Sequence, residues 1–190
     1  MTDTTSQAFF EQKYKATPDP WNFGSSSYEL MRYDAILNAM GDRHFAYAFE
    51  PGCSVGVLTE KLAQRCDRVD AMDISPTAVA QAKQRCQELT NTYITCDSLS
   101  QWSEQTPFDL LIFSEIGYYF EEPTLRTILR GLVSKLAPSG LFVACHWLGH
   151  SPDHILTGDR VHEVIAESHE LVHQRAERHA NFRLDCWSRR

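Results

Sequence analysis

The sequence predicts an α/β fold in which a doubly wound, seven-stranded sheet is mostly parallel and ends in an antiparallel hairpin. Three observations lead to this prediction. Strand-like and helical segments alternate from residue 46 onward. The run 108–114, Phe-Asp-Leu-Leu-Ile-Phe-Ser, is almost continuously apolar, as in strands buried on both faces of a parallel sheet. Near the C-terminal end, the strand-like runs 170–178 and 181–188 follow each other across a short turn.

Length and composition predict a single cytoplasmic domain. The 190 residues suit one domain, 1–190, with a helical lid or cap over 1–44 and a core over 45–190. The formal charge of -7 would repel a nucleic acid, so we expect no nucleic-acid partner. No secretion leader, membrane-spanning run or obligate protein partner is evident. The six cysteines are scattered without a C-x-x-C pair, and we expect reduced thiols.

The first part of the chain predicts two helices. Residues 7–16 have helical spacing and stop before the two prolines of 17–20. A second helix is expected over 28–40, with serines 25–27 as candidate N-caps and Gly41 as its stop. Its inward stripe is expected to comprise Leu30, Tyr33, Ile36, Leu37 and Met40.

The remaining segments predict the order of elements in the core. Ser75 and Pro76 form a typical helix start. Residues 138–140, Pro-Ser-Gly, predict a turn. Strands are expected over 46–50, 69–74, 91–95, 108–114 and 141–146, and helices over 55–65, 75–86, 124–136 and 157–168.

The segment 46–56, Ala-Tyr-Ala-Phe-Glu-Pro-Gly-Cys-Ser-Val-Gly, predicts a strand, a tight loop and a helix start. It allows three interpretations. A dinucleotide fingerprint is weak, because Gly52 and Gly56 flank Ser54 at even spacing. G-x-S-x-G is also the nucleophile elbow of α/β-hydrolases, but several strands precede it in those enzymes. The third interpretation is the loop of S-adenosylmethionine (SAM) methyltransferases, in which an acid, here Glu50, lies two residues before the first glycine.

The third interpretation requires acids at the ends of the next strands, and the sequence has them. Ligands of an open parallel sheet bind outside the carboxyl ends of its strands. Asp73 is placed to accept hydrogen bonds from both ribose hydroxyls, and Asp97 from an adenine amino group. Glu50 either fixes the N–H groups of the loop or reaches the ammonium of the cofactor. Any one of these acids is also explained as a helix cap, whereas three in register with the loop favour a cofactor site.

Motifs spread over nearly the whole chain resemble one known family. The loop 50–59, the Asp-Ile-Ser-Pro of 72–78 and the Ser-Glu-Ile-Gly-Tyr-Tyr of 114–119 are together the most specific of them. Further matches lie at Asp19-Pro20-Trp21, His146-Trp147 and 156–159 with His162. These segments resemble nodulation protein S (NodS)-type SAM-dependent N-methyltransferases. Ser54 departs from the central glycine that is usual in methyltransferases, although this branch tolerates serine.

The resemblance implies a Rossmann-like core and transfer of a methyl group from SAM, with S-adenosylhomocysteine (SAH) as the product. In the nodulation enzymes the acceptor is the deacetylated amino sugar at the end of a chitin oligosaccharide. Here we expect a small-molecule or oligosaccharide amine, with O- or S-methylation of a small metabolite as the alternative. The expected cofactor-binding residues are Trp21, Arg32, Glu50, Gly52, Cys53, Ser54, Gly56, Asp73, Ile74, Asp97, Ser98 and Ser114.

Four residues are candidates for acceptor chemistry. Glu115 and His146 follow the fourth and fifth expected strands, where the acceptor should enter, and a carboxylate or imidazole there can hold a neutral amine or take its proton. Tyr118 and Tyr119 could shape the pocket, stack on a sugar face or contact the sulfonium. The competing explanations are that Glu115 caps the next turn and that His146 is a satisfied core histidine.

Other features also have competing explanations. Trp21 either belongs to a lid over the cofactor or packs the front helices together. Arg32 either reaches the cofactor carboxylate or is a solvated surface charge. Histidines 146, 150 and 154 recur every four residues, but Gly149 and Pro152 break any helix there, so we expect no metal site. From other classes, the alternatives are an esterase using Ser54 and a SAM-binding module without acceptor chemistry.

Overall fold

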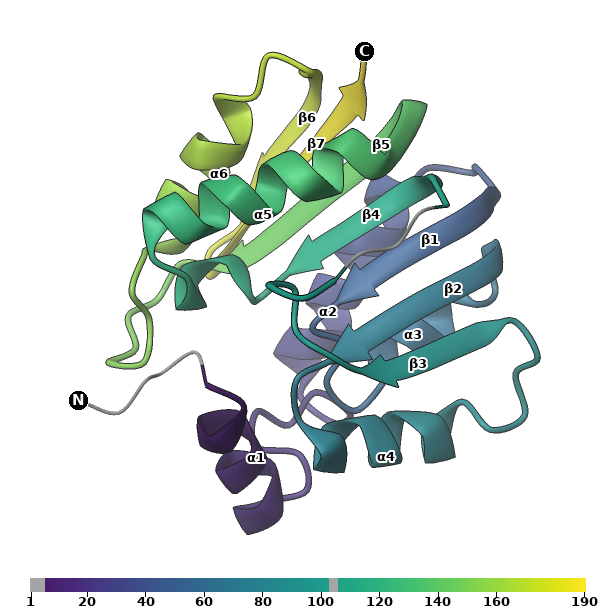
Figure 1. The fold of residues 1–190 in the computed structure, drawn as a ribbon, viewed down its shortest axis with the longest axis vertical. Coiled ribbons are helices and arrows are strands. Elements are labelled where there is room, and N and C mark those ends of the chain that lie inside the picture. The colour runs from purple at the N-terminus through teal and green to yellow at the C-terminus, as the bar shows by residue number, and fades with distance from the viewer. Residues whose placement is uncertain (1–5, 103–105) are drawn as a thin grey trace. The chain divides into compact units, whose positions relative to one another are not determined.

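A computed structural model describes residues 6–102 and 106–190. Its seven strands follow the order β3-β2-β1-β4-β5-β7-β6, which confirms the expected α/β fold class (Figure 1). The chain divides into two units, residues 1–102 and 103–190. The expected single domain with a lid boundary at residue 44 stays a prediction.

In its described residues, 6–102, the first unit contains three parallel strands and four helices. β1 pairs with β2, and β2 with β3; Glu50 is paired with Ala71 and Asp73 with Cys96. The carboxyl ends of the three strands therefore lie at the same edge of this part of the sheet. The elements are α1 (Gln7–Ala16), α2 (Ser27–Ala39), β1 (Phe45–Pro51), α3 (Val57–Leu62), β2 (Cys66–Asp73), α4 (Pro76–Arg85) and β3 (Thr92–Cys96).

Local sequence signals explain several element boundaries in the first unit. The Ser75 side chain accepts a hydrogen bond from the Ala78 N–H, and Pro76 occupies the first turn of α4, as expected. Gly56 begins α3 with a φ of 80°. A Cβ at position 56 would lie 2.9 Å from the Ala82 Cβ, so the close approach of α3 and α4 requires a glycine there.

The second unit contains one parallel strand pair and an antiparallel C-terminal hairpin. β4 and β5 are parallel, whereas β7 pairs antiparallel with both β5 and β6, which confirms the expected hairpin. Helices α5 and α6 contact each other and β5 (Figure 1). The elements are β4 (Phe108–Ser114), the short helix η1 (Gly117–Tyr119), α5 (Glu122–Lys135), β5 (Leu136–Trp147), α6 (Gly158–Ala166), β6 (Leu171–Arg178) and β7 (Phe182–Arg189).

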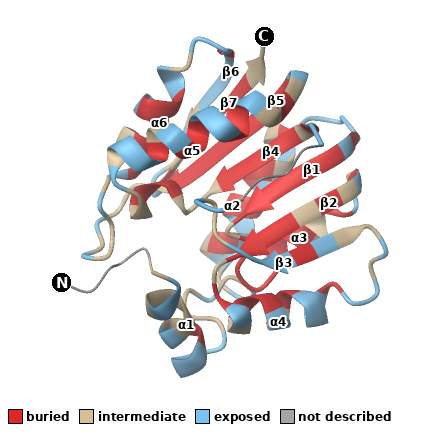
Figure 2. Ribbon diagram, in the orientation of Figure 1, coloured by how far each residue is buried: buried red, intermediate tan, exposed pale blue. Residues whose placement is uncertain are grey.

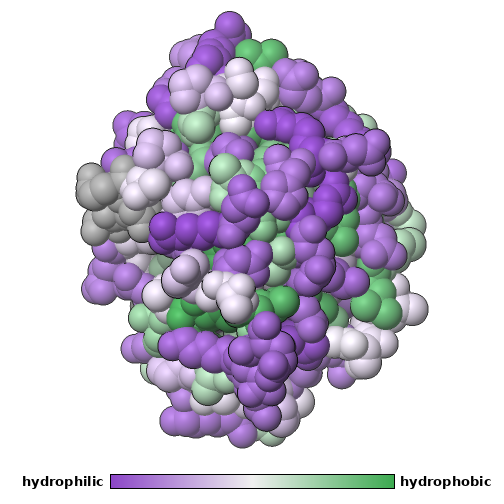
Figure 3. All heavy atoms as spheres, turned by 90° about the vertical axis from the view of Figure 1, so that its right-hand side faces the viewer, coloured by the Kyte–Doolittle hydropathy of each residue, from purple (hydrophilic) through white to green (hydrophobic). Residues whose placement is uncertain are grey.

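Burial is concentrated in strands β1, β4, β5 and β7, whereas the edge strands β3 and β6 are mostly exposed (Figure 2). In β4, Leu110, Leu111, Ile112 and Phe113 are fully buried, as the continuous apolar run predicts. On the face drawn in Figure 3, hydrophilic side chains predominate and hydrophobic atoms lie in separate patches between them. Among the residues that the structure describes, no helix is both apolar enough and long enough to cross a bilayer.

Three expectations about elements are wrong in detail. The helix expected over 55–65 covers only Val57–Leu62, because Cys66 already pairs with Phe45 and residues 63–65 must turn into β2. The turn expected at 138–140 is an irregularity within β5: Phe108 pairs with Leu136 and Leu110 with Leu141, so the residues between bulge out of the ladder.

The third correction concerns the face that α2 presents to the protein interior. Leu30, expected to point inward, is 39% exposed. Glu29 and Arg32 are buried instead, and Arg32 is 2% exposed. The charged pair, rather than the leucine, occupies the buried face because each member provides the partner that burial of the other requires.

Candidate active site

The loop after β1 is fixed to the end of β2 by hydrogen bonds from its backbone. Gly52 N–H and Cys53 N–H both donate to the Met72 carbonyl, at 2.7 and 2.9 Å. Ser54 N–H donates to Asp73 Oδ2 at 2.9 Å. Gly52 and Ser54 have φ values of 79° and 51°, in the left-handed region. The first of these conformations favours a glycine, and the second carries strain because serine has a Cβ.

Asp73 is the acid that organises this loop. Its other oxygen, Oδ1, accepts the Ser75 N–H at 2.9 Å, and the side chain is 8% exposed. Burial raises the pKa of Asp73 to about 6, although the backbone N–H groups of Ser75 and Ser54 act in the opposite direction. A bound group that supplies hydrogen-bond donors or positive charge would therefore favour the ionised form.

Glu50 is buried beside Asp73. Its Oε2 accepts a hydrogen bond from the Thr59 hydroxyl at 2.6 Å. Burial raises the pKa of Glu50 to about 8, the negative charge of Asp73 also raises it, and the bond to Thr59 and the charge of Arg32 lower it. The expectation that Glu50 fixes the N–H groups of the loop does not fit the contacts, because Met72 and Asp73 accept those bonds.

Arg32 of α2 belongs to the same buried group of charges. Its guanidinium pairs with Glu29 through two N–H groups, with Nε 2.9 Å from Oε2. Its positive charge also acts on Glu50. The alternative that Arg32 is a solvated surface charge is therefore wrong, while its contact with a cofactor carboxylate stays a prediction.

Two side chains of helix α1, Tyr14 and Glu11, make polar contacts that no sequence pattern indicated. The Tyr14 hydroxyl donates to Ser54 Oγ at 2.5 Å. Glu11 accepts hydrogen bonds from the Ser75 and Thr77 hydroxyls, at 2.6 and 2.8 Å, and from the Thr77 N–H at 3.1 Å. These contacts join residues 40 to 66 positions apart, and local periodicity carries no information about them.

Trp21 packs on Tyr14 with 5.5 Å between ring centroids. It is partly exposed, and it also stacks on Phe23. Packing therefore describes its contacts in the structure. Trp21 packs on Tyr14, and Tyr14 in turn contacts the Ser54 hydroxyl of the loop. The lid function expected for Trp21 therefore stays a prediction.

Asp97 lies at the same edge as Asp73. It follows β3, is exposed, and its N–H donates to the Asp73 carbonyl at 3.1 Å. Its carboxylate accepts the Ser98 N–H at 2.7 Å. Ile74 follows directly after β2. The structure thus brings together, in the first unit, the expected cofactor-binding residues of all three strand ends.

The surroundings of Ser54 do not fit a nucleophile elbow. Its hydroxyl accepts a bond from Tyr14, whereas a nucleophilic serine donates to a base. The first unit has one histidine, His44, which lies before β1 and pairs with Asp67 at 2.7 Å. In the described part of the chain only helices precede β1. The esterase alternative therefore has no structural support.

In the second unit, Glu115 directly follows β4 and Ser114. Oε1 of Glu115 accepts the Trp147 N–H and Oε2 accepts the Tyr118 hydroxyl, both at 2.7 Å. Its backbone has a φ of 60°. Both carboxylate oxygens are thus oriented by donors from two different segments. The alternative that Glu115 caps the next turn is wrong, because Ile116 occupies the N-cap position of η1, without a side-chain capping hydrogen bond.

The two tyrosines of η1 form an aromatic cluster with His154. Tyr118 stacks on His154 with 3.7 Å between ring centroids, and Tyr119 meets both rings edge-on. Tyr118 is 3% exposed. Burial raises the pKa of Tyr119 above its ordinary value, as do the charges of Glu115 and Asp153. Tyr119 is consequently a hydrogen-bond donor rather than a base at neutral pH.

His146 is fully buried, and both of its ring nitrogens have partners. Nε2 lies 3.1 Å from the Gly117 N–H nitrogen, and Nδ1 lies 3.1 Å from His162 Nε2. This geometry favours the core-histidine explanation over a direct role with substrate. His146 lies in β5 and no helix runs from it to His154. No group of three metal-binding side chains occurs among the described residues.

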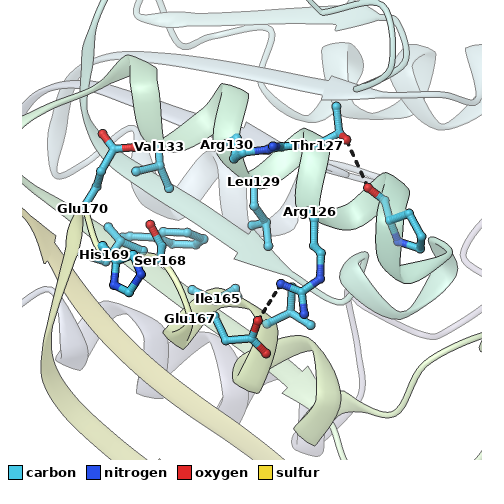
Figure 4. Close-up of a pocket in the computed structure, with 14 residues that line it drawn as sticks. Arg126, Thr127, Leu129, Arg130, Val133, Ile165, Glu167, Ser168, His169 and Glu170 are labelled. Carbon is cyan, nitrogen blue, oxygen red and sulfur yellow. Dashed lines mark hydrogen bonds and ion pairs between the residues drawn. The ribbon is translucent and has the colours of Figure 1, made fainter.

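A cavity of about 590 Å³ lies elsewhere in the second unit (Figure 4). Helix α5 and the segment from the end of α6 to the start of β6 line it. Leu129, Val133 and Ile165 contribute apolar surface, and Arg126 pairs with Glu167 at 2.6 Å beside them. None of the expected site residues lines this cavity.

Comparisons with a family model and with known proteins point to the same family. The model of the family described as nodulation protein S (NodS) matches residues 2–188. Nodulation protein S of Sinorhizobium fredii is 36% identical over 130 residues, which cover 67% of this chain and 60% of that protein. Nodulation protein S of Bradyrhizobium diazoefficiens is 33% identical over 141 residues, covering 73% and 66%. The chain therefore matches less than two thirds of the length of these relatives.

A solved structure shows the same fold. The crystal structure of the N-methyltransferase NodS from Bradyrhizobium japonicum, in complex with S-adenosylhomocysteine, superposes with a TM-score of 0.85. The superposition covers 97% of this chain and 98% of that one, at 24% sequence identity. It confirms the class I methyltransferase fold for this chain.

Proposed function

The chain belongs to the nodulation protein S family, and we propose that it is a SAM-dependent N-methyltransferase that acts on the amine of a small molecule or an amino-sugar oligosaccharide. The observation that carries this proposal is the pair of buried acids, Glu50 and Asp73, beside the loop 52–56. Both acids lie where ligands of an open α/β sheet bind. Their chemistry suits a ligand that offers hydroxyl donors and positive charge.

The residues of the first unit fit SAM. Each oxygen of Asp73 accepts one backbone N–H, and each retains a second lone pair for a ribose hydroxyl. Glu50 and Asp73 both have raised pKa values, and a neighbouring cation would return them to the charged form. Arg32 presents a guanidinium, which matches a carboxylate. When bound, SAM supplies a methyl group that its sulfonium activates toward a nucleophile.

Glu115, Tyr118 and Tyr119 in the second unit would bind the acceptor. The Trp147 N–H and the Tyr118 hydroxyl orient the two oxygens of Glu115, which leaves this carboxylate with a fixed direction for accepting an amine N–H. An amine must be neutral to attack, so a carboxylate that takes or shares its proton promotes the reaction. The protonated Tyr119 hydroxyl and the aromatic rings beside it suit the hydroxyls and apolar face of a sugar.

The proposal extends to location and partners. We propose a cytoplasmic enzyme that needs no protein partner, and the six free cysteines support a reducing compartment. The family and the acidic net charge of -7 favour an amine or oligosaccharide acceptor over a nucleic acid.

The direct test uses SAM labelled in its methyl group. The protein is incubated with chitin oligosaccharides that carry either a free or an acetylated terminal amino group, and with amine, alcohol and thiol metabolites. We expect label only in acceptors with a free amine, because the acetylated nitrogen is not nucleophilic. Labelled alcohols or thiols alone would replace the proposal with O- or S-methylation. Cofactor binding without any labelled product would indicate a binding module.

Glu115→Gln separates the acceptor role from cofactor binding. We expect turnover to fall by about 10²-fold or more, the scale of a lost acid–base contribution, with SAH affinity nearly unchanged. Glu121→Gln is the matched control, because Glu121 is an exposed acid six positions away at the start of α5. Isothermal calorimetry with SAH and initial rates with the acceptor measure the two quantities. An equal loss in both would place Glu115 on the cofactor instead.

A further inference from the structure

A chain of three polar side chains crosses the interior of the second unit. His146 of β5, His162 of α6 and Asp185 of β7 are each 0% exposed. His146 Nδ1 lies 3.1 Å from His162 Nε2, and His162 Nδ1 lies 2.7 Å from Asp185 Oδ2. At its other end the chain reaches backbone, because the Gly117 N–H donates to His146 Nε2 at 3.1 Å. The four groups thus form a continuous path between β7 and η1.

The path has one consistent direction. Gly117 N–H is a donor, so His146 Nε2 must accept and carry no proton. The proton of a neutral His146 is then on Nδ1 and donates to His162 Nε2. His162 in turn carries its proton on Nδ1 and donates to the Asp185 carboxylate. Burial lowers the pKa of His162 below its ordinary value, which favours the neutral ring that this arrangement needs.

The end of the chain lies in the acceptor loop, which we define as residues 115–119. Val161 and His146 also pack closely against Gly117: a Cβ at this position would lie 2.4 Å from Val161 Cγ1 and 2.9 Å from His146 Nε2. Tyr118, the next residue, donates its hydroxyl to Glu115. A displacement of Gly117 therefore moves Tyr118, the donor of the Glu115–Tyr118 hydrogen bond.

The acceptor loop contains strain that other contacts must hold. Glu115 has a φ of 60°, a conformation that is strained for a residue with a Cβ and persists only where neighbouring contacts fix it. The Glu115 N–H donates to the Cys145 carbonyl, and its carboxylate accepts the Trp147 N–H. These contacts fix the start of the loop, and the bond from Gly117 to His146 fixes its middle.

The buried chain is not explained by stability. Apolar side chains of similar volume would avoid the desolvation of a carboxylate and two imidazoles. The Oδ1 atom of Asp185 has no hydrogen-bond donor among the described residues, and only an ion contact to His173 Nε2 at 3.7 Å. Arg183 Nε balances the charge of Asp185 through the same Oδ2 atom that His162 uses, at 2.7 Å.

We propose that Asp185, His162 and His146 are positioning residues for methyl transfer, which fix the protonation pattern at Gly117 and thereby the geometry of the acceptor loop. Asp185 sets which nitrogen of His162 carries the proton, and His162 does the same for His146. A reversed His146 would place an N–H against the Gly117 N–H and push the loop away. The catalytic part of this inference rests on the proposed function, while the protonation pattern does not.

The first measurement examines the protonation pattern itself. In protein labelled with 15N-histidine, the 15N shifts and long-range 1H couplings of each ring report which nitrogen is protonated. We expect His146 and His162 both to carry the proton on Nδ1. A proton on Nε2 of His146 overturns the proposal regardless of whether any acceptor is found.

The second measurement compares the activity and the stability of three variants. His162→Leu fits the apolar neighbours on α6 but removes the acceptor for His146 Nδ1–H. His162→Gln retains an amide oxygen that can accept that proton. Val164→Ala is the matched control, because Val164 is buried on the same helix but takes no part in the hydrogen-bonded path from Asp185 to Gly117. Turnover with the amine acceptor, SAH affinity, unfolding free energy and amide exchange of Gly117 are measured for each.

We expect His162→Leu to lower kcat about tenfold or more through loop misplacement, with SAH affinity within about twofold and faster exchange at Gly117. His162→Gln should retain most of the turnover even if it is less stable than His162→Leu. A folded His162→Leu variant whose kcat and Gly117 exchange match those of Val164→Ala would overturn the proposal. If His162→Leu does not fold, the exchange rate of Gly117 in His162→Gln and the ring protonation decide. If the wild type methylates no acceptor, the proposed function fails, and the same two readouts still test the chain.

Discussion

At the scale of single residues, the ends of β1 and β2 carry two carboxyl groups, Glu50 and Asp73, that the protein has removed from water. Asp73 accepts hydrogen bonds from the Ser54 and Ser75 N–H groups, and Glu50 accepts one from the neutral hydroxyl of Thr59. Burial of such carboxylates is costly unless donors compensate it. The ribose hydroxyls of SAM can donate hydrogen bonds to these carboxylates, and its positive charge can compensate theirs.

Asp73→Asn is expected to weaken SAH binding by about 1–3 kcal/mol, the scale of a lost charged hydrogen bond. The amide keeps the size of the side chain, but one of its two terminal atoms can no longer accept a hydrogen bond. Calorimetric titration of the folded variant with SAH measures the change. Asp70→Asn is the control on the same strand, because Asp70 bonds Tyr47 and Arg68 instead. Wild-type affinity in Asp73→Asn would remove its role at the ribose.

Ser54 allows the strain of the loop to be separated from the bond to Tyr14. A residue with a Cβ at a φ of 51° costs about 1–2 kcal/mol relative to glycine, and the buried bond to Tyr14 is worth about 1 kcal/mol. Ser54→Ala keeps the strain and loses the bond, so it should destabilise the protein more than Ser54→Gly. Denaturant unfolding of both, in a double-mutant cycle with Tyr14→Phe, measures the coupling. A coupling near zero would show that the hydrogen bond contributes nothing.

At the scale of elements, helix packing in the first unit depends on one glycine. Gly56→Ala should lower the unfolding free energy by about 2–4 kcal/mol, since the left-handed φ of 80° and the overlap with Ala82 both act against a Cβ. Gly131→Ala is the opposite case: it lies in the exposed face of α5 with open space around it, and should stabilise by about 0.5–1 kcal/mol. Thermal and denaturant unfolding give both values. Equal effects would mean that α3 can move away from α4 at little cost.

Sequence periodicity predicted those parts of the fold that depend on neighbouring residues. The cap at Ser75, the buried strand β4 and the antiparallel hairpin all follow from local patterns, and the structure confirms them. The acids at the strand ends were also predictable, because each directly follows an apolar run. The bulge within β5 was not predictable. Residues 138–140, Pro-Ser-Gly, are typical of an ordinary turn, and only their position in the pairing with β4 makes them a strand irregularity.

The parts of the site that sequence reasoning missed all depend on contacts between distant residues. Tyr14 meets Ser54 across 40 positions, and His162 meets Asp185 across 23. Arginine is usually a surface residue, so no direct sign in the sequence indicated that Arg32 is buried. Only Glu29, three positions earlier, could have indicated an internal ion pair. The acceptor role of His146 was expected from its place after a strand, but that strand end points its ring into the interior.

At the scale of the whole molecule, two sets of acids give the stability opposite dependences on pH. Glu50 and Asp73 have pKa values of about 8 and about 6, above those of the unfolded chain. Their contribution is full below the unfolded values and is lost as the pH rises through the folded ones. Glu11 has a pKa of about 2, and that of Asp159 is also lowered. The contribution of these two is present above their unfolded values and is lost as the pH falls.

The unfolding free energy should therefore be greatest at about pH 4 to 5. It should fall toward pH 8 by an amount on the order of a few kcal/mol, because one pKa unit corresponds to about 1.4 kcal/mol. Glu50→Gln tests the larger part of this decline. The amide still accepts the Thr59 hydroxyl but cannot ionise, so the variant should lose less stability than the wild type between pH 5 and pH 8, and should be the more stable of the two at pH 8. Urea titrations at several pH values give both curves, with Glu60→Gln as the control, because Glu60 is a half-exposed acid on the following helix. Parallel curves for Glu50→Gln and wild type would show that Glu50 ionises in the folded protein as readily as in the unfolded chain.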